Sequence, residues 1–210
     1  MKLDELYGIV DEAVREEELT AEEIPNIDLY VDQILNLVSE KNSESAKRYR
    51  DRQLTKTMIN NYSKDGLITP VKGKKYNREQ IVQILSVYTL KNTLSIGEIK
   101  RLLDGAYSIE GYGGEDLIET YGRYIEIKKG NREYSREILD ELMKRNGLNI
   151  ENERDFMLIV GSMLSMSAFL RNMAQEVIDV KYPVAEEIPD KPKKEKKKKK
   201  TVENEAKEKA

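Results

Sequence analysis

The chain has no cysteine, no histidine and no tryptophan among its 210 residues. Without cysteine, disulfides, thiolate nucleophiles and thiolate metal sites are excluded, and without histidine the commonest general base and metal ligand are missing. Carboxylates and lysines alone can support glycoside or Mg²⁺-dependent chemistry. However, the sequence has no phosphate-binding glycine loop of the P-loop or Rossmann spacing and no Asp-x-Asp cluster. We therefore expect no enzyme, no cofactor and no metal site.

Long apolar segments are also scarce. The longest, residues 156–170, is short for a membrane span and contains Gly161 and several serines. The N-terminal residues lack the basic and apolar regions of a signal peptide. We expect a buried helix over 156–170 and a cytoplasmic protein without a membrane partner.

The net charge of −3 conceals two segments of opposite charge. Residues 1–23 carry nine acidic and two basic side chains, a net charge of −7. Residues 41–80 carry eleven basic and four acidic side chains, a net charge of +7. A basic segment within an acidic protein indicates a polyanionic partner for that segment. The acidic segment is also expected to be able to fold back on the basic one and weaken such binding.

Apolar residues at spacings of three and four predict a helix within residues 3–18 and a second one from Asn26 onward. The following segment, up to about residue 53, is polar and poorly periodic. This indicates a connection that contains at most a partial helical turn.

A short helix over residues 56–65 is predicted next, with Thr55 as its N-cap and Gly66 beyond its end. At 100° per residue its two faces separate completely. The apolar face consists of Met58, Ile59 and Tyr62. The polar face consists of Lys56, Thr57, Asn60, Asn61, Ser63 and Lys64. Lysine, amide and hydroxyl side chains are the types that contact phosphates and base edges, although a plain solvated face remains the alternative.

A basic hairpin turned at Gly73 is predicted within residues 71–77. Two helices follow, each with a capping pair at its start. The first spans 78–90 and has the pair Asn77 and Gln80; the second is short, starts after Ser95 and has the pair Ser95 and Glu98. The resulting order of helix, connection, basic helix, basic hairpin and two helices is typical of a winged helix-turn-helix.

From Asp104 the sequence holds six glycines and four tyrosines over 28 residues and has little periodicity, so we expect a loop with one poor helix. Helices are predicted over 132–146, ended by Gly147, and over 152–179. The lysine-rich residues 182–210 have too few apolar side chains to pack and are predicted to be disordered.

Residues 58–103 resemble the DNA-binding domain of MerR-type transcription regulators. The resemblance is carried by "MINNYSKDGLI", by the wing end "KKYN" and by "LSIGEIKRLL". It places Asn60 at the family's arginine, Tyr62 at its second tyrosine, Lys74 at its wing arginine and Tyr76 at its wing tyrosine. More narrowly, "IPNIDLYVDQIL", "LTKTMINNYSKDGLITP" and "KKYN" resemble a Gram-positive bacterial family, domain of unknown function 1836.

Pattern and resemblance together predict a mainly α, MerR-like winged helix-turn-helix protein that binds duplex DNA and regulates transcription. The predicted organisation is an acidic helix in 1–23, the winged-helix domain in 24–104, a helical dimerisation and effector region in 105–181, and a disordered tail in 182–210. The residues expected to contact DNA are Thr55, Lys56, Thr57, Asn60, Asn61, Tyr62, Lys64, Lys72, Lys74, Lys75, Tyr76 and Arg78. Asn60 and Asn61 suit adenine edges, whereas the lysines and Arg78 suit phosphates.

The resemblance also implies a homodimer formed through the C-terminal helices. Four methionines within 157–173 are compatible with core packing, a ligand pocket or a subunit interface, and these alternatives stay open. The glycine- and tyrosine-rich loop of residues 107–124 is a candidate contact for a small-molecule or protein effector. Met58 and Asn60 replace the MerR threonine and arginine, so the alternative function is a non-catalytic protein-interaction adaptor on a winged-helix scaffold.

Overall fold

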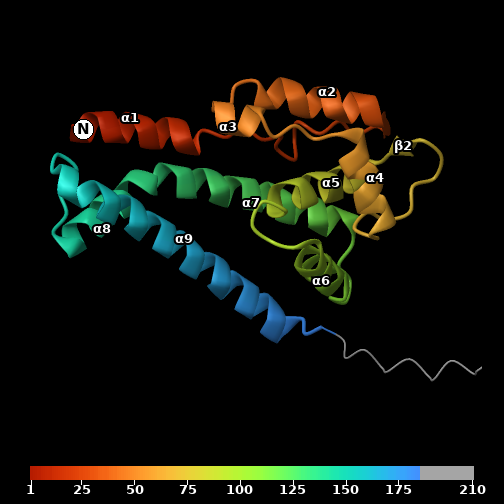
Figure 1. The fold of residues 1–210 in the computed structure, drawn as a ribbon. Helices are drawn as coiled ribbons and strands as arrows, with labels where there is room; N and C mark the ends of the chain where they lie inside the picture. The colour runs from red at the N-terminus through yellow and green to blue at the C-terminus, as the bar shows by residue number, and fades with distance from the viewer. Residues whose placement is uncertain (185–210) are drawn as a thin grey trace, which may run out of the picture.

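The computed structural model describes residues 1–184 and confirms that the protein is mainly α (Figure 1). Its helices are α1 (Leu3–Val14), α2 (Val31–Asn42), α3 (Lys47–Arg50), α4 (Lys56–Lys64), α5 (Arg78–Leu90), α6 (Ile96–Tyr107), α7 (Gly114–Glu133), α8 (Ser135–Asn146) and α9 (Glu153–Lys181). Two short strands, β1 (Leu29–Tyr30) and β2 (Lys75–Tyr76), pair in antiparallel orientation.

The predicted starts of three helices are confirmed by their caps. At α4, Thr55 Oγ1 accepts a hydrogen bond of 3.2 Å from the backbone N–H of Met58. Asn77 with Gln80 and Ser95 with Glu98 form the reciprocal capping boxes of α5 and α6. Gly66 and Gly147 end α4 and α8 in the left-handed region, with φ of 69° and 63°.

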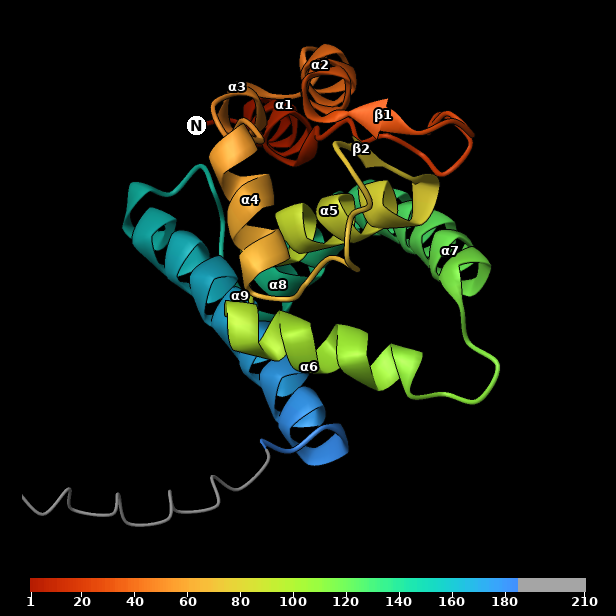
Figure 2. The same cartoon turned by 90° about the vertical axis from the view of Figure 1, so that its right-hand side faces the viewer.

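The larger of two hydrophobic cores is built around α5, which lies behind α4 and between α2 and α7 (Figure 2). Residues 80–85 of α5 are all buried, including Ile81 and Ile84. Ile59 of α4, Ile99 of α6 and the first half of α7 complete this core. The larger core thus holds α4 and the loop before β2 against α5.

The smaller core joins α1, α8 and the first turns of α9 through Leu6, Leu139, Met143, Ile150 and Ile159. The 20-residue α7 runs from the larger core to this smaller one (Figure 1). The prediction of a loop with one poor helix over 104–131 was therefore wrong in its main part.

The glycines of this segment obscured a helical pattern. Leu117, Ile118, Tyr121 and Ile125 repeat at spacings of three and four and are buried against α5. Gly122 faces the segment between α1 and β1, since a Cβ built on it would lie 3.4 Å from the Cβ of Ala21, an ordinary van der Waals distance. The glycine thus lies within an unbroken α7 and does not end the helix.

Two predictions near the basic segment also need correction, one helix start and one strand pairing. The helix expected from Asn26 begins only at Val31, because Leu29 and Tyr30 are extended and pair with Tyr76 and Lys75. The basic hairpin predicted within residues 71–77 was therefore wrong, because β2 pairs with β1 and not with the other arm of the turn at Gly73. The partial helical turn expected in the polar connection is present as α3.

The acidic N-terminal segment does not fold back on the basic segment as a unit. Asp11 pairs with Arg136 of α8, while Glu16 and Glu18 both pair with Lys128 of α7. Among the ion pairs of residues 1–184, one links the two segments, between Glu23 and Lys41 at 2.6 Å. The acidic residues instead form ion pairs that hold the N-terminal segment against α7 and α8.

The expectation of a buried helix over 156–170 was wrong. In α9 the buried side chains are Ile159 and Ile178, and most of its other apolar side chains are exposed. By length and composition alone, α9 is long and apolar enough to cross a membrane. Core helices of soluble proteins meet the same criteria. The tail predicted to be disordered spans residues 182–210. Of these, residues 185–210 lie outside the described part of the chain.

Candidate nucleic-acid interface

Helix α4 presents its polar side to solvent because its apolar side is fixed in the core. Ile59 has no exposed surface and Tyr62 is 4% exposed. Lys56, Asn60 and Lys64 are one turn apart along the opposite side, and all three are exposed. The polar stripe expected from the sequence is therefore available to a partner.

The loop that precedes β2 is anchored by two buried glutamines of α5. Gln83 Oε1 accepts a hydrogen bond of 2.8 Å from the backbone N–H of Thr69. Gln80 Nε2 donates to the backbone oxygens of Thr69 and Pro70 at 3.1 and 3.2 Å. Beyond this anchor the loop turns at Gly73, whose φ is 84°. One end of the loop is thus rigid while its lysines remain exposed.

A hollow of about 1080 Å³ lies between the polar side of α4, this loop and α6. Lys56, Asn60 and Lys64 line it from α4, and Lys74 lines it from the loop. Lys100 of α6 closes the third side, where its Nζ donates to the backbone oxygen of Gly66 at 3.1 Å. We call this hollow the basic groove.

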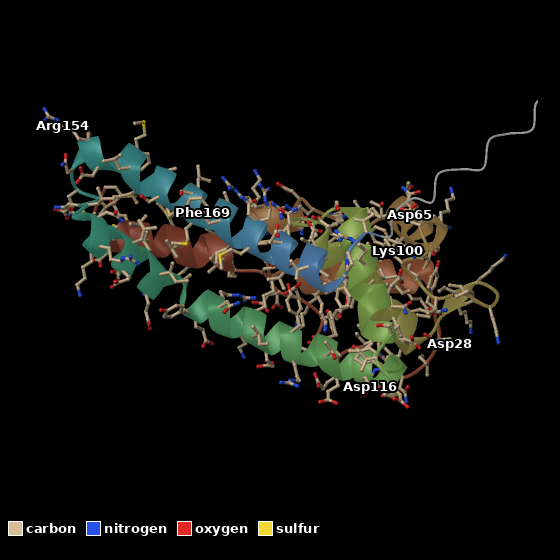
Figure 3. The ribbon with its side chains drawn as sticks, turned by 90° about the horizontal axis from the view of Figure 1, so that it is seen from below. Asp28, Asp65, Lys100, Asp116, Arg154 and Phe169 are labelled. Carbon is tan, nitrogen blue, oxygen red and sulfur yellow. The ribbon has the colours of Figure 1, made fainter. Side chains whose placement is uncertain are left out.

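The basic groove lies at one end of the molecule. Figure 3 shows Lys100 and Asp65 close to each other at this end, whereas Arg154, at the start of α9, marks the opposite end. Asp32 and Asp104 are the acidic side chains that line the groove, against four lysines. The balance of charge within the groove is positive.

Most lysines of this region have no acidic partner, like many other basic side chains of the described residues, but here they gather around one hollow. Within residues 1–184, Lys56, Lys64, Lys72 and Lys74 take part in no ion pair, and Lys100 has a loose one with Asp104 at 3.6 Å. In contrast, five basic side chains that join different elements are paired with carboxylates, namely Lys41, Arg101, Lys128, Arg132 and Arg136. Unpaired lysines around a hollow favour a bound anion.

Nine of the twelve residues predicted to contact DNA are exposed on or beside the groove. They are Thr55, Lys56, Thr57, Asn60, Asn61, Lys64, Lys72, Lys74 and Lys75. Lys75 is partly engaged, because its Nζ lies 5.0 Å from the centre of the Tyr30 ring.

The other three predicted contacts need correction. Tyr62 is buried under Lys91, whose Nζ lies 5.9 Å from the ring centre, and burial raises the pKa of Tyr62 to about 12. Tyr76 is 9% exposed, because its ring packs into the larger core. Arg78 is half-buried and its Nη2 donates to the backbone oxygen of Ala21 at 2.7 Å. These side chains support the site from within and do not face a partner.

The tyrosines expected in an effector loop are also structural. Tyr107 donates a hydrogen bond of 2.7 Å to Glu79 Oε1, and its ring packs edge-on against Tyr112. Tyr121 donates to the backbone oxygen of Leu19 at 2.7 Å. Burial raises the pKa of Tyr107 and of Tyr121.

Sequence reasoning missed Lys100 as a groove residue. It lies on the exposed side of an ordinary amphipathic helix, 36 residues beyond Lys64, so no local pattern connects the two. The available signal in the sequence was its place two residues after Glu98, in the first turns of a helix with a capping box.

Comparison with known proteins gives one match. The family model described as Domain of unknown function (DUF1836) matches residues 19–124, which include all elements of the basic groove. No curated protein and no solved structure matches the chain.

Proposed function

The chain belongs to the DUF1836 family, whose function is unknown, and we propose from the groove itself that it is a cytoplasmic DNA-binding transcription regulator. In this proposal α4 is the recognition helix and the loop of residues 71–76 is a basic wing, on a MerR-like winged helix-turn-helix. Duplex DNA is the partner.

The observation that carries the proposal is the gathering of four lysines from α4, the loop and α6 around one groove, where those of α4 and the loop have no ion pair within residues 1–184. A phosphate backbone that lies in the basic groove meets Lys56 and Lys64 on one side and Lys74 on the other. Each such contact releases a counterion from the DNA, which supplies affinity without sequence preference. Lys100 adds a fourth positive charge on the third side of the groove.

Sequence preference in this proposal comes from the amides of α4. Asn60 lies between Lys56 and Lys64 on the exposed stripe, and Asn61 is exposed on the next position. A side-chain amide can pair with N6 and N7 of adenine at the same time. The capped N-terminus of α4 at Thr55 adds backbone N–H donors for a phosphate.

The adaptor alternative also has an observation in its favour. The exposed apolar side chains of α9 are a surface of the kind that binds another protein. The two functions differ in what the lysines do, because an adaptor that contacts its partner through α9 does not need the basic groove.

Selection of bound sequences from a random duplex library tests the proposal. The full chain is expected to enrich a short motif, and a variant with Lys56→Glu and Lys64→Glu is expected to enrich none. Lys129→Glu and Lys144→Glu, two exposed lysines on α7 and α8, form the charge-matched control and are expected to leave the motif intact. Equal recovery of all sequences by the wild type and by both variants would favour the adaptor.

A further inference from the structure

Seven apolar residues of α9 follow an unbroken heptad pattern. Their spacings alternate between four and three, as in the a and d positions of a coiled coil. They are Ile159, Met163, Met166, Leu170, Met173, Val177 and Val180, and we call them the α9 seam. In this register Met163, Leu170 and Val177 occupy a positions.

The fold uses only the first two residues of the α9 seam. Ile159 is buried in the smaller core and Met163 packs against it. The exposed fraction then rises along the seam, from 43% at Met166 through 62% at Met173 to 75% at Val180. The last two heptads of the seam therefore have no partner among the described residues.

The packing of α6 leaves this part of the seam open. Gln175 donates to Glu98 at 2.9 Å, Asp179 pairs with Arg101 at 2.6 Å, and Ile178 is buried. These three residues occupy the f, c and b positions, which lie on the other side of the helix from a and d. In Figure 1, α9 runs along one edge of the molecule, with α8 beside its start and α6 beside its end.

We propose that the α9 seam binds the α9 seam of a second copy of this chain, in parallel orientation, from Met166 onward. A heptad seam requires another helix with the same period, and the chain itself supplies one. This inference rests on α9 alone and does not depend on DNA binding.

The charges beside the seam support a second copy and its orientation. Glu176 occupies a g position and Lys181 the e position of the next heptad, and both are exposed. In a parallel pair, the g residue of one helix lies beside the e residue of the following heptad in the other. A parallel dimer thus forms two Glu176–Lys181 pairs, whereas an antiparallel pair centred on the exposed heptads sets the two Glu176 side chains near each other.

The N-terminal halves of the two α9 helices separate in this dimer. Helix α8 packs beside the first turns of α9. The partner helix therefore cannot contact the part of the seam that lies N-terminal to Met166. Phe169 flanks the open part of the seam at a g position and is 60% exposed. Figure 3 shows Phe169 midway along α9, between the end marked by Arg154 and the end beside α6, where a partner helix can cover it.

Sedimentation equilibrium of the full chain gives the first test. The wild type is expected to be a dimer at micromolar concentration, and Met173→Glu is expected to be a monomer with an unchanged helical circular-dichroism spectrum. Leu164→Glu is the matched control, because Leu164 is 66% exposed on the same helix but points about 180° away from Met173. It is expected to remain a dimer.

Single cysteines give the orientation, since the chain has none of its own. In a parallel dimer each a position faces its own copy, so Leu170→Cys and Val177→Cys are each expected to cross-link on oxidation. In an antiparallel dimer a faces d, and these two variants do not both cross-link. Leu164→Cys is the control that should remain reduced.

A charge exchange completes the test. Glu176→Lys and Lys181→Glu are each expected to weaken the dimer, and the double variant is expected to restore it. The proposal would be overturned if the wild type is a monomer or if Met173→Glu leaves the dimer unchanged. It would also be overturned if the cysteines at the a positions do not cross-link. A monomer that sediments with phosphatidylcholine vesicles unless Met173 is replaced by Glu would overturn it too, because the seam would then face lipid.

Discussion

Lys75 Nζ lies 5.0 Å from the centre of the Tyr30 ring, across the strand pair that joins β1 to β2. Through this pair the segment before α2 holds the far end of the loop that borders the basic groove. Gln80 and Gln83 hold its near end. The loop is therefore fixed at both ends, while Lys72 and Lys74 between them remain exposed.

Lys74→Ala is expected to weaken binding to every DNA sequence to a similar degree. Loss of one phosphate contact should reduce the slope of log K against log salt by about 0.9. Fluorescence anisotropy with two unrelated duplexes at several salt concentrations measures both effects. Lys129→Ala removes an exposed lysine of α7 and should change neither. A loss confined to one of the two duplexes would show that Lys74 reads sequence.

Asn60→Ala is expected to relax sequence preference. If the amide pairs with an adenine edge, its loss should reduce discrimination at that base pair by about 1–3 kcal/mol. The measurement compares the affinities of the wild type and the variant for the selected motif and for each of its single-base changes. Asn131→Ala, which removes an exposed amide of α7 away from the groove, is the control. Unchanged discrimination at all positions would exclude Asn60 from base readout.

The local parts of this fold were predictable, and the non-local parts were not. The cap of α4 at Thr55 and the left-handed Gly66 depend on residues within a few positions of each other. The pairing of Tyr30 with Lys75 and the approach of Lys100 to Gly66 join residues more than 30 positions apart, which no periodicity reveals. For the same reason, composition showed that α9 is apolar but could not show that most of it stays uncovered.

Gly105→Ala and Gly97→Ala, both in α6, are expected to change stability in opposite directions. A Cβ on Gly105 would overlap the ring of Tyr182, so this ring must shift away from α6 at a cost of about 1 kcal/mol. A Cβ on Gly97 meets nothing within 4 Å, and alanine should stabilise the helix by about 0.5 kcal/mol. Urea unfolding followed by circular dichroism measures both. Equal effects of the two changes would show that Tyr182 does not pack on Gly105.

The contact between α1 and α8 is expected to weaken in acid. The hydrogen bond from Arg136 lowers the pKa of Asp11. A carboxyl group whose pKa is lowered by folding contributes stability above its unfolded pKa, and this contribution is lost as the pH falls through the folded pKa. The Tm difference between wild type and Asp11→Asn should thus be present at pH 7 and shrink below about pH 4. A difference that stays constant down to pH 2 would mean that this pair does not stabilise the fold.

The central claim is that unpaired lysines around the basic groove bind the phosphates of duplex DNA, and the salt dependence of binding tests it most directly. With about five phosphate contacts, the wild type should give a log–log slope of about −4 to −5. A variant with Lys56, Lys64 and Lys74 changed to alanine should give a slope closer to zero by about 2.7. A wild-type affinity that does not change with salt, or a slope that the three substitutions leave unaltered, would contradict the account.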